Sequence, residues 1–256
     1  MNEREKSVFK LACLSGGLML ESGAETFRAE DTVRYICSAA SLTADVLAMP
    51  TGMFVSAESD GEEQRSMVRR VKKRSIDLGK IHEINNVSRR FVAGELTVDD
   101  AISELENLGK QKPVNKIFLV FCAGISALFF TLLFGGELFD AVVSFAASCA
   151  VQILLLTFKK TDIYNLTSNL IVGTVISLFS VISVSLFSMG NSEAIIVGGI
   201  LPYLPGLAML NAIRDTIMGD LVSGVSRLGE VLLSAVSLAL GVGVVFAVYM
   251  ALGGIV

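Results

Sequence analysis

The sequence predicts a small cytoplasmic α+β domain, residues 1–112, followed by an α-helical polytopic membrane domain, residues 113–256, with about five transmembrane helices. The first observation is the charge distribution: only four of the 21 Lys and Arg residues, and seven of the 25 Asp and Glu residues, lie beyond residue 116. The second is the mean hydropathy of +0.64, which comes mainly from long apolar runs in the second part. The third is that helical and strand-like periodicities both occur within the first part.

The elements of the first part follow from these periodicities. Apolar residues recur at helical spacing from Ser7 to Leu20, where the pair Gly16-Gly17 is expected to interrupt the helix. A second helix is expected to begin at Ser22, with Glu25 as its capping-box partner. Three strand-like runs and two helices follow, at Asp45–Met49, Thr51–Glu58, Ser66–Lys72, Ile76–Val92 and from Thr97 onward. This mixture predicts an α+β domain that ends at a linker near residue 112.

The second part consists of apolar runs, each close to the roughly 20 residues that a helix needs to cross a hydrocarbon core. The five spans are expected near residues 117–134, 138–158, 165–189, 194–210 and 231–256. If they alternate in direction, all Lys and Arg residues around them fall on one side: Lys110, Lys112, Lys116, Lys159, Lys160, Arg214 and Arg227. The positive-inside rule then predicts a multi-pass protein of the cytoplasmic (inner) membrane with its N-terminal domain in the cytoplasm.

Two prolines interrupt the fourth expected span. Pro202 and Pro205 each remove a backbone donor, so the helix is expected to break and leave carbonyl groups unpaired before a new helix starts at Gly206. In transporters, the ends of such broken helices often hold substrates or ions. The candidate substrate-binding or proton-coupling residues are Pro202, Pro205, Gly206, Asn211, Arg214, Asp215, Asp220, Arg227 and Glu230.

The residue types in this segment suggest separate roles. Helical spacing places Asn211 and Asp215 on one face of the new helix and the later charged residues on another. Arg214 has the guanidinium fork that suits a carboxylate anion. A carboxylate whose pKa is raised by desolvation is suited to carry a proton. The candidates for this role are Asp215, Asp220 and Glu230.

Other interpretations of the sequence stay open. Residues 211–230 could instead form a cytoplasmic amphipathic segment whose charges lie among lipid headgroups. The whole chain could be a membrane scaffold or sensor that does not transport. An enzyme is not predicted, because no nucleophile is paired with a base. No cofactor or metal is predicted either, and the mixed charges, with a net value of −4, exclude the basic footprint of a nucleic-acid-binding protein.

Two stretches carry a family resemblance. The first is Leu-Met-Leu-Glu-Ser-Gly-Ala-Glu-Thr at residues 18–26. The second is the series Pro-x-x-Pro-Gly, Asn-x-x-Arg-Asp, Gly-Asp and Ser-Gly between residues 202 and 224. Together they resemble the threonine/serine exporter family over essentially the whole chain. The resemblance also directs attention to Glu21, Ser22, Glu25 and Arg28, for which docking or gating in the cytoplasm is expected and helix capping is the alternative.

The resemblance implies a secondary exporter of small carboxylate metabolites that is driven by the proton gradient. Threonine and serine are one substrate class, and dicarboxylates such as succinate are another. The chain is similar to the short, split members of the family, which carry the amino-terminal module only. A second small membrane subunit is therefore an expected partner, with a homo-oligomer as an alternative assembly.

Overall fold

The computed structural model describes residues 1–59, 64–109, 114–158, 165–187 and 189–253. The chain forms two compact units. The first comprises residues 1–112 together with 206–229, and the second comprises residues 113–205 together with 230–256. A segment from the apolar half of the sequence thus belongs to the same unit as the N-terminal domain, a grouping that hydropathy does not reveal.

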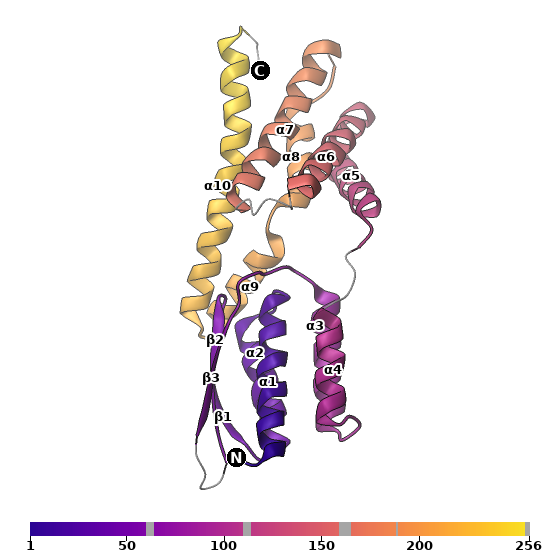
Figure 1. Cartoon of the computed structure of the whole chain (residues 1–256). Helices are drawn as coiled ribbons and strands as arrows, with labels where there is room; N and C mark the ends of the chain where they lie inside the picture. The colour runs from indigo at the N-terminus through magenta and orange to yellow at the C-terminus, as the bar shows by residue number, and fades with distance from the viewer. Residues whose placement is uncertain (60–63, 110–113, 159–164, 188, 254–256) are drawn as a thin grey trace. The chain divides into compact units, whose positions relative to one another are not determined.

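The first unit contains a three-stranded antiparallel sheet in the order β1-β2-β3. Figure 1 shows helices α1 and α2 packed along one face of this sheet. The bounds of the elements are α1 Glu3–Glu21, α2 Thr26–Ser38, β1 Thr43–Met49, β2 Gly52–Glu58, β3 Arg65–Arg70, α3 Leu78–Val92, α4 Val98–Gly109 and α9 Gly206–Ile217. The mostly helical architecture with a small sheet near the N-terminus agrees with the predicted combination of elements.

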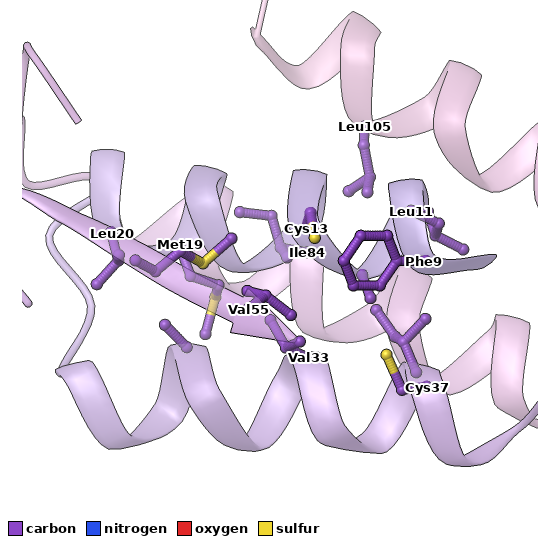
Figure 2. Packing of buried hydrophobic residues seen from close by; sticks show 14 of the residues in the cluster. Phe9, Leu11, Cys13, Met19, Leu20, Val33, Cys37, Val55, Ile84 and Leu105 are labelled. Atoms are coloured by element: carbon purple, nitrogen blue, oxygen red, sulfur yellow. The ribbon is translucent and has the colours of Figure 1, made fainter. Parts of the chain in front are cut away.

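The core of the first unit lies between α1, α2, α3, α4 and the inner face of the sheet (Figure 2). Phe9 and Met19 from α1 contact this core from one side, and Val33, Val55 and Leu105 close it from α2, β2 and α4. All five side chains are at most 2% exposed. Burial of such side chains supplies about 1.5–3 kcal/mol each relative to an exposed position.

Helix α1 continues through Gly16 and Gly17, so the interruption predicted there is wrong. The glycines serve close packing instead. A Cβ on Gly16 would lie 2.6 Å from Val33 Cγ2, and one on Gly17 would overlap the side chain of Arg69. The absence of side chains therefore lets α2 and β3 approach α1, which compensates for the roughly 1 kcal/mol that each glycine costs inside a helix.

The second unit consists of helices. Their bounds are α5 Lys116–Leu133, α6 Leu138–Phe158, α7 Asn165–Phe187, α8 Ser192–Ile200, the short 3-10 helix η1 Leu201–Tyr203 and most of α10 Leu221–Ala251. Among the described residues, α5, α6, α7 and α10 are each long and apolar enough to cross a membrane, and α8–η1 with α9 makes a fifth span if the pair counts as one. The chain is therefore a membrane protein with several candidate spans.

Small residues allow the helices of the second unit to pack closely. A Cβ on Gly173 of α7 would overlap the carbonyl oxygen of Leu238, and one on Gly241 of α10 would overlap the carbonyl oxygen of Leu170. Such contacts between backbones are typical of helix pairs in lipid, where apolar side chains alone give little preference for association. The absence of side chains at these glycines therefore lets α7 and α10 pack closely.

The predicted fourth span, 194–210, is divided in the structure. Helix α8 passes into η1, which ends at Tyr203, and α9 begins only at Gly206. Pro205 has no N–H to donate to the carbonyl of Leu201, which accepts from the N–H of Leu204 at 3.2 Å instead. The fifth predicted span, 231–256, also differs, because α10 already begins at Leu221.

Candidate functional site

The turn between α1 and α2, residues 22–25, contributes backbone groups to the candidate site. Gly23 has φ +80° and donates its N–H to the carbonyl of Leu20, while the N–H of Ala24 donates to the carbonyl of Met19. This pair of bonds is the Schellman motif that ends many helices. Helix α2 begins at Thr26 with Glu25 as N-cap, but the Glu25 side chain makes no capping bond. The predicted start at Ser22 with a capping box is therefore wrong, and the Glu25 carboxylate is left for other partners.

Replacing Gly23 with alanine is expected to destabilise the first unit by more than the roughly 1–2 kcal/mol that the left-handed conformation alone costs. A Cβ at this position would also lie 3.1 Å from the carbonyl oxygen of Ser75. Gly94→Ala is the matched control, because Gly94 has φ +79° and a Cβ added there would meet nothing within 4 Å. Thermal unfolding of the purified chain measures both, and equal losses would contradict the packing contribution.

A second Schellman turn joins α9 to α10. Gly219 has φ +92°, and the N–H of Asp220 donates to the carbonyl of Asp215 at 2.9 Å. Asp220 then caps the next helix, since its Oδ1 accepts from the N–H of Ser223 at 3.2 Å. The Gly-Asp pair thus ends one helix and starts another, which leaves Asp220 Oδ2 available for a different contact.

Thr26 joins the two turns, although 189 residues separate it from Asp215. Asp215 Oδ1 accepts from the backbone N–H of Thr26 at 3.1 Å and lies 3.0 Å from its hydroxyl oxygen. The same hydroxyl oxygen lies 2.7 Å from Asp220 Oδ2. A threonine hydroxyl carries a single hydrogen, so it either donates fully to one carboxylate or shares that hydrogen between the two.

Arg227 neutralises Asp215 from the other side. Its Nε lies 3.0 Å from Asp215 Oδ2, an ion pair by distance that is not aligned as a hydrogen bond. A terminal NH2 group of the same guanidinium donates to the carbonyl of Ala24 at 2.8 Å. The side chains of Asp215 and Arg227 are 0% and 7% exposed. Burial of such a pair costs a large desolvation free energy, which can exceed the attraction between the two charges. Stability of the fold alone therefore gives little reason for an ion pair at this position.

Glu25 forms the outer half of the site. Its carboxylate accepts from Arg214 through Oε1 and from Arg28 through Oε2, the latter at 3.3 Å. Asn211 donates its amide to the carbonyl of Gly23 at 2.8 Å. We call the eight residues with these contacts the charge cluster: Glu25, Thr26, Arg28, Asn211, Arg214, Asp215, Asp220 and Arg227. Its three acidic and three basic side chains balance.

Acid is expected to weaken the contact between Glu25 and Arg214. Burial works to raise the pKa of Glu25, but hydrogen bonds from its own backbone N–H and from Arg214 outweigh burial, with help from the charge of Arg28. The pKa therefore lies below its ordinary value of 4.5. A carboxyl group with a lowered pKa stabilises the fold above the unfolded-state pKa, and this contribution disappears as the pH falls through the folded-state pKa.

The wild-type chain should therefore lose stability steeply below about pH 4.5, and Glu25→Gln should flatten that loss by lowering stability at neutral pH. The measurement is the midpoint of thermal unfolding as a function of pH. Glu83→Gln is the control, because Glu83 is exposed on α3. A Glu25→Gln profile that runs parallel to the wild-type profile would contradict the expectation.

The structure brings most of the predicted site residues together, from two stretches treated separately in the sequence. Asn211, Arg214, Asp215, Asp220 and Arg227 all join the cluster, and so do Glu25 and Arg28. The expected division into two helix faces is wrong, because the Schellman turn at Gly219 lets Arg227 reach Asp215. Arg214 contacts Glu25 instead of standing open as an anion clamp.

The remaining predicted residues lie elsewhere. Glu21 pairs with Arg69 at 3.5 Å, and the carbonyl of Ser22 accepts from the N–H of Asp77. Pro202 lies within η1, Pro205 follows it, and Gly206 begins α9. Glu230 is exposed on α10. Sequence reasoning missed Thr26, whose only signal was its position at the end of the 18–26 motif.

A comparison with protein families identifies the group to which the chain belongs. A family model described as "Putative threonine/serine exporter" matches residues 10–249. The chain belongs to the threonine/serine exporter family. The resemblance stated from the sequence is thereby confirmed, and so is the prediction that the chain is not an enzyme, because the family comprises exporters.

Relatives of this family member are distant and longer. The chain is 24% identical over 242 residues to a "Probable threonine/serine exporter" of Mycobacterium tuberculosis, which covers 93% of this chain and 45% of the relative. It is 25% identical over 231 residues to "Pheromone-regulated membrane protein 10" of Eremothecium gossypii, covering 86% and 30%. An uncharacterised protein of Schizosaccharomyces pombe is 24% identical over 255 residues, covering 96% and 33%. The chain thus spans less than half the length of these relatives. No solved structure matches it.

Proposed function

We propose that the chain is a subunit of a secondary exporter, driven by the proton gradient, for small carboxylate metabolites. Threonine and serine are the first substrate class, and dicarboxylates such as succinate are the second. The first unit lies in the cytoplasm and the spans lie in the inner membrane, as the distribution of Lys and Arg indicates. The observation that carries the proposal is the position of one threonine hydroxyl between two carboxylates, Asp215 and Asp220.

This arrangement supports proton coupling because it distinguishes two charge states. With one proton shared, Thr26 can donate to one carboxylate and accept from the other, and both short contacts are satisfied. With both carboxylates ionised, the single hydroxyl hydrogen has to serve two negatively charged acceptors, so each contact is weaker. Loss of the proton therefore weakens the link between the α1–α2 turn and the α9–α10 turn. Opening and closing of this link is the gating step that we propose.

The substrate is proposed to act at the outer half of the cluster. Arg214 uses one terminal nitrogen for Glu25, and its side chain is 51% exposed, whereas that of Glu25 is 5% exposed. A carboxylate that arrives from the cytoplasm can compete with Glu25 for the remaining donors of this guanidinium, since an arginine offers five. The ammonium group of threonine or serine would then find the displaced Glu25 carboxylate. Dicarboxylates lack this second interaction, so amino acids rank first.

The interrupted span contributes the permeation path in this proposal. The backbone break between Tyr203 and Gly206 starts a new helix, α9, and the N-terminus of a helix favours an anion. A second small membrane subunit is proposed as the partner in transport, because the sequence resembles the short, split members of the family.

Counterflow in proteoliposomes tests the proposal, with the chain reconstituted alone and together with its suspected partner. Wild-type protein should exchange threonine and serine faster than succinate and should accumulate substrate only under an imposed pH gradient. Asp215→Asn should abolish the response to that gradient, whereas Asp99→Asn, an exposed carboxylate on α4, should not. Full coupled transport by Asp215→Asn would refute proton coupling at the cluster. No transport of any substrate in either preparation would favour the scaffold or sensor interpretation.

A further inference from the structure

The outer face of the sheet carries an apolar row that crosses all three strands. Leu47, Phe54 and Val68 occupy equivalent positions on β1, β2 and β3, because the register pairs Leu47 with Phe54 and Phe54 with Val68. The three residues are 57%, 47% and 68% exposed. Helices α1 and α2 pack on the opposite face, where Met53, Val55 and Ala57 are buried (Figure 1). The outer row is therefore left without a covering element among the described residues.

Charges of opposite sign flank this row along one diagonal. Asp45 lies on β1 two residues before Leu47, and Arg70 lies on β3 two residues after Val68. Both are exposed, and alternation along the strands places both on the same face as the row. The two charges thus lie at opposite corners of the face, with Phe54 midway between them on the central strand.

From this arrangement we propose that the outer face of the sheet binds the same face of a second copy of this chain. A twofold axis through Phe54, in the plane of the interface and perpendicular to the line from Asp45 to Arg70, exchanges the two charged corners. Each Asp45 then faces the Arg70 of the other copy, and the two Phe54 rings meet on the axis. Such a contact is isologous and closed, as in most homodimers. The strands of the two sheets cross at a large angle, as they do in orthogonal sheet packings.

Pairing through the sheet edges is a poorer alternative. The free edge of β1 is occupied at one point, because Arg34 donates to the carbonyl of Val46 at 3.2 Å. The strand β3 ends in Arg70, whose exposed charge would repel that of a second β3 edge. Both edges are thus less suited to pairing than the outer face, which directs association to that face.

An anionic lipid surface fits this face less well than a second copy. Arg70 would be attracted to lipid phosphates, but Asp45 on the same face, and Glu58 beyond it, would be repelled. A second copy satisfies both signs of charge. The face of a three-stranded sheet is smaller than the ~800 Å² per partner of a standard interface. Association therefore depends on the raised effective concentration of chains that share one membrane.

Cysteine cross-linking of the full chain in proteoliposomes tests the symmetry of the contact. Phe54→Cys should form a disulfide with its own copy under mild oxidation, because the position lies on the axis. Glu58→Cys, also exposed on the central strand, should not exceed the wild-type chain, which controls for the four native cysteines. Asp45→Cys and Arg70→Cys should each fail alone and cross-link when the two proteins are mixed before reconstitution. Self-linking by Glu58→Cys as strong as that by Phe54→Cys would overturn the proposal.

Charge exchange tests the same contact without cysteine chemistry at the charged corners. Asp45→Arg and Arg70→Asp should each abolish the Phe54→Cys cross-link, and the chain that carries both changes should recover it. All of these positions are exposed, so unchanged thermal unfolding should confirm that the sheet is intact. A double variant that stays uncross-linked would overturn the proposal. So would protection of Phe54→Cys from a water-soluble maleimide in nanodiscs that hold a single chain and phosphatidylglycerol, since lipid would then cover the face.

Discussion

Replacement of Arg227 with methionine is expected to destabilise the first unit by about 3–5 kcal/mol, the cost of leaving a buried charge without its partner. Asp215 is fully buried, and its Oδ2 is 3.0 Å from Arg227 Nε. Methionine preserves much of the arginine stem but removes the charge and the bond to the carbonyl of Ala24. The measurement is the midpoint of thermal unfolding of the purified chain in detergent.

Two further variants separate the charge from the packing. Arg89→Met removes an exposed arginine from α3 and should change stability by no more than about 0.5 kcal/mol. The double variant Asp215→Leu with Arg227→Met replaces the ion pair with apolar groups and should recover most of the stability, because neither buried charge then remains. If the double variant is as unstable as Arg227→Met alone, the ion pair is not the source of the loss.

Replacement of Thr26 with valine is the change expected to affect transport most. Valine keeps the shape of the side chain but removes the hydroxyl that lies between Asp215 and Asp220. Removal of a buried hydrogen-bonding partner costs about 1–3 kcal/mol, which corresponds to roughly a 5- to 150-fold change in a rate that depends on it. Threonine counterflow should slow by a factor in this range, and the response to the pH gradient should disappear.

The controls for this prediction lie on the same helix. Thr26→Ser keeps the hydroxyl and should retain coupled transport. Thr32→Val removes another largely buried hydroxyl, but one that donates only to the carbonyl of Arg28 within α2. Its effect on transport should be small. If Thr32→Val and Thr26→Val slow counterflow equally, the loss is a general effect on α2 and not a property of the bridge.

The apolar helices and the strands were predictable because their signals are local. Apolar runs gave the helix at 138–158 with the same bounds as α6, and alternation gave three strands within two residues of their observed ends. The turn at Gly219 was less accessible. Hydropathy treats 211–230 as a polar interval between spans, whereas Asp220 caps α10 and starts it ten residues before the predicted span. A capping residue inside a polar interval is easily mistaken for a loop residue.

The sequence predicted the residues of the candidate site on each of its two segments, but not the contacts between the segments. Periodicity places Asp215 on a helix, and the 18–26 motif draws attention to Glu25, but no local pattern reports that Glu25 and Thr26 lie against Arg214 and Asp215. Such contacts join segments almost 190 residues apart, and they depend on how α9 folds against the N-terminal helices. The contact between Arg214 and Glu25 could not be predicted for the same reason, because the two residues are remote in sequence.

Helix α10 belongs to both compact units, since the boundary between them falls after Gly229 within an unbroken helix of 31 residues. At about 1.5 Å per residue, such a helix is longer than a hydrocarbon core of about 30 Å by roughly ten residues. Each residue inserted or deleted between Asp220 and Arg227 would turn Arg227 by about 100° about the helix axis relative to Asp220, which begins the helix. The number of residues in the first two turns of α10, and not only their polarity, is therefore under constraint, because Arg227 has to reach Asp215.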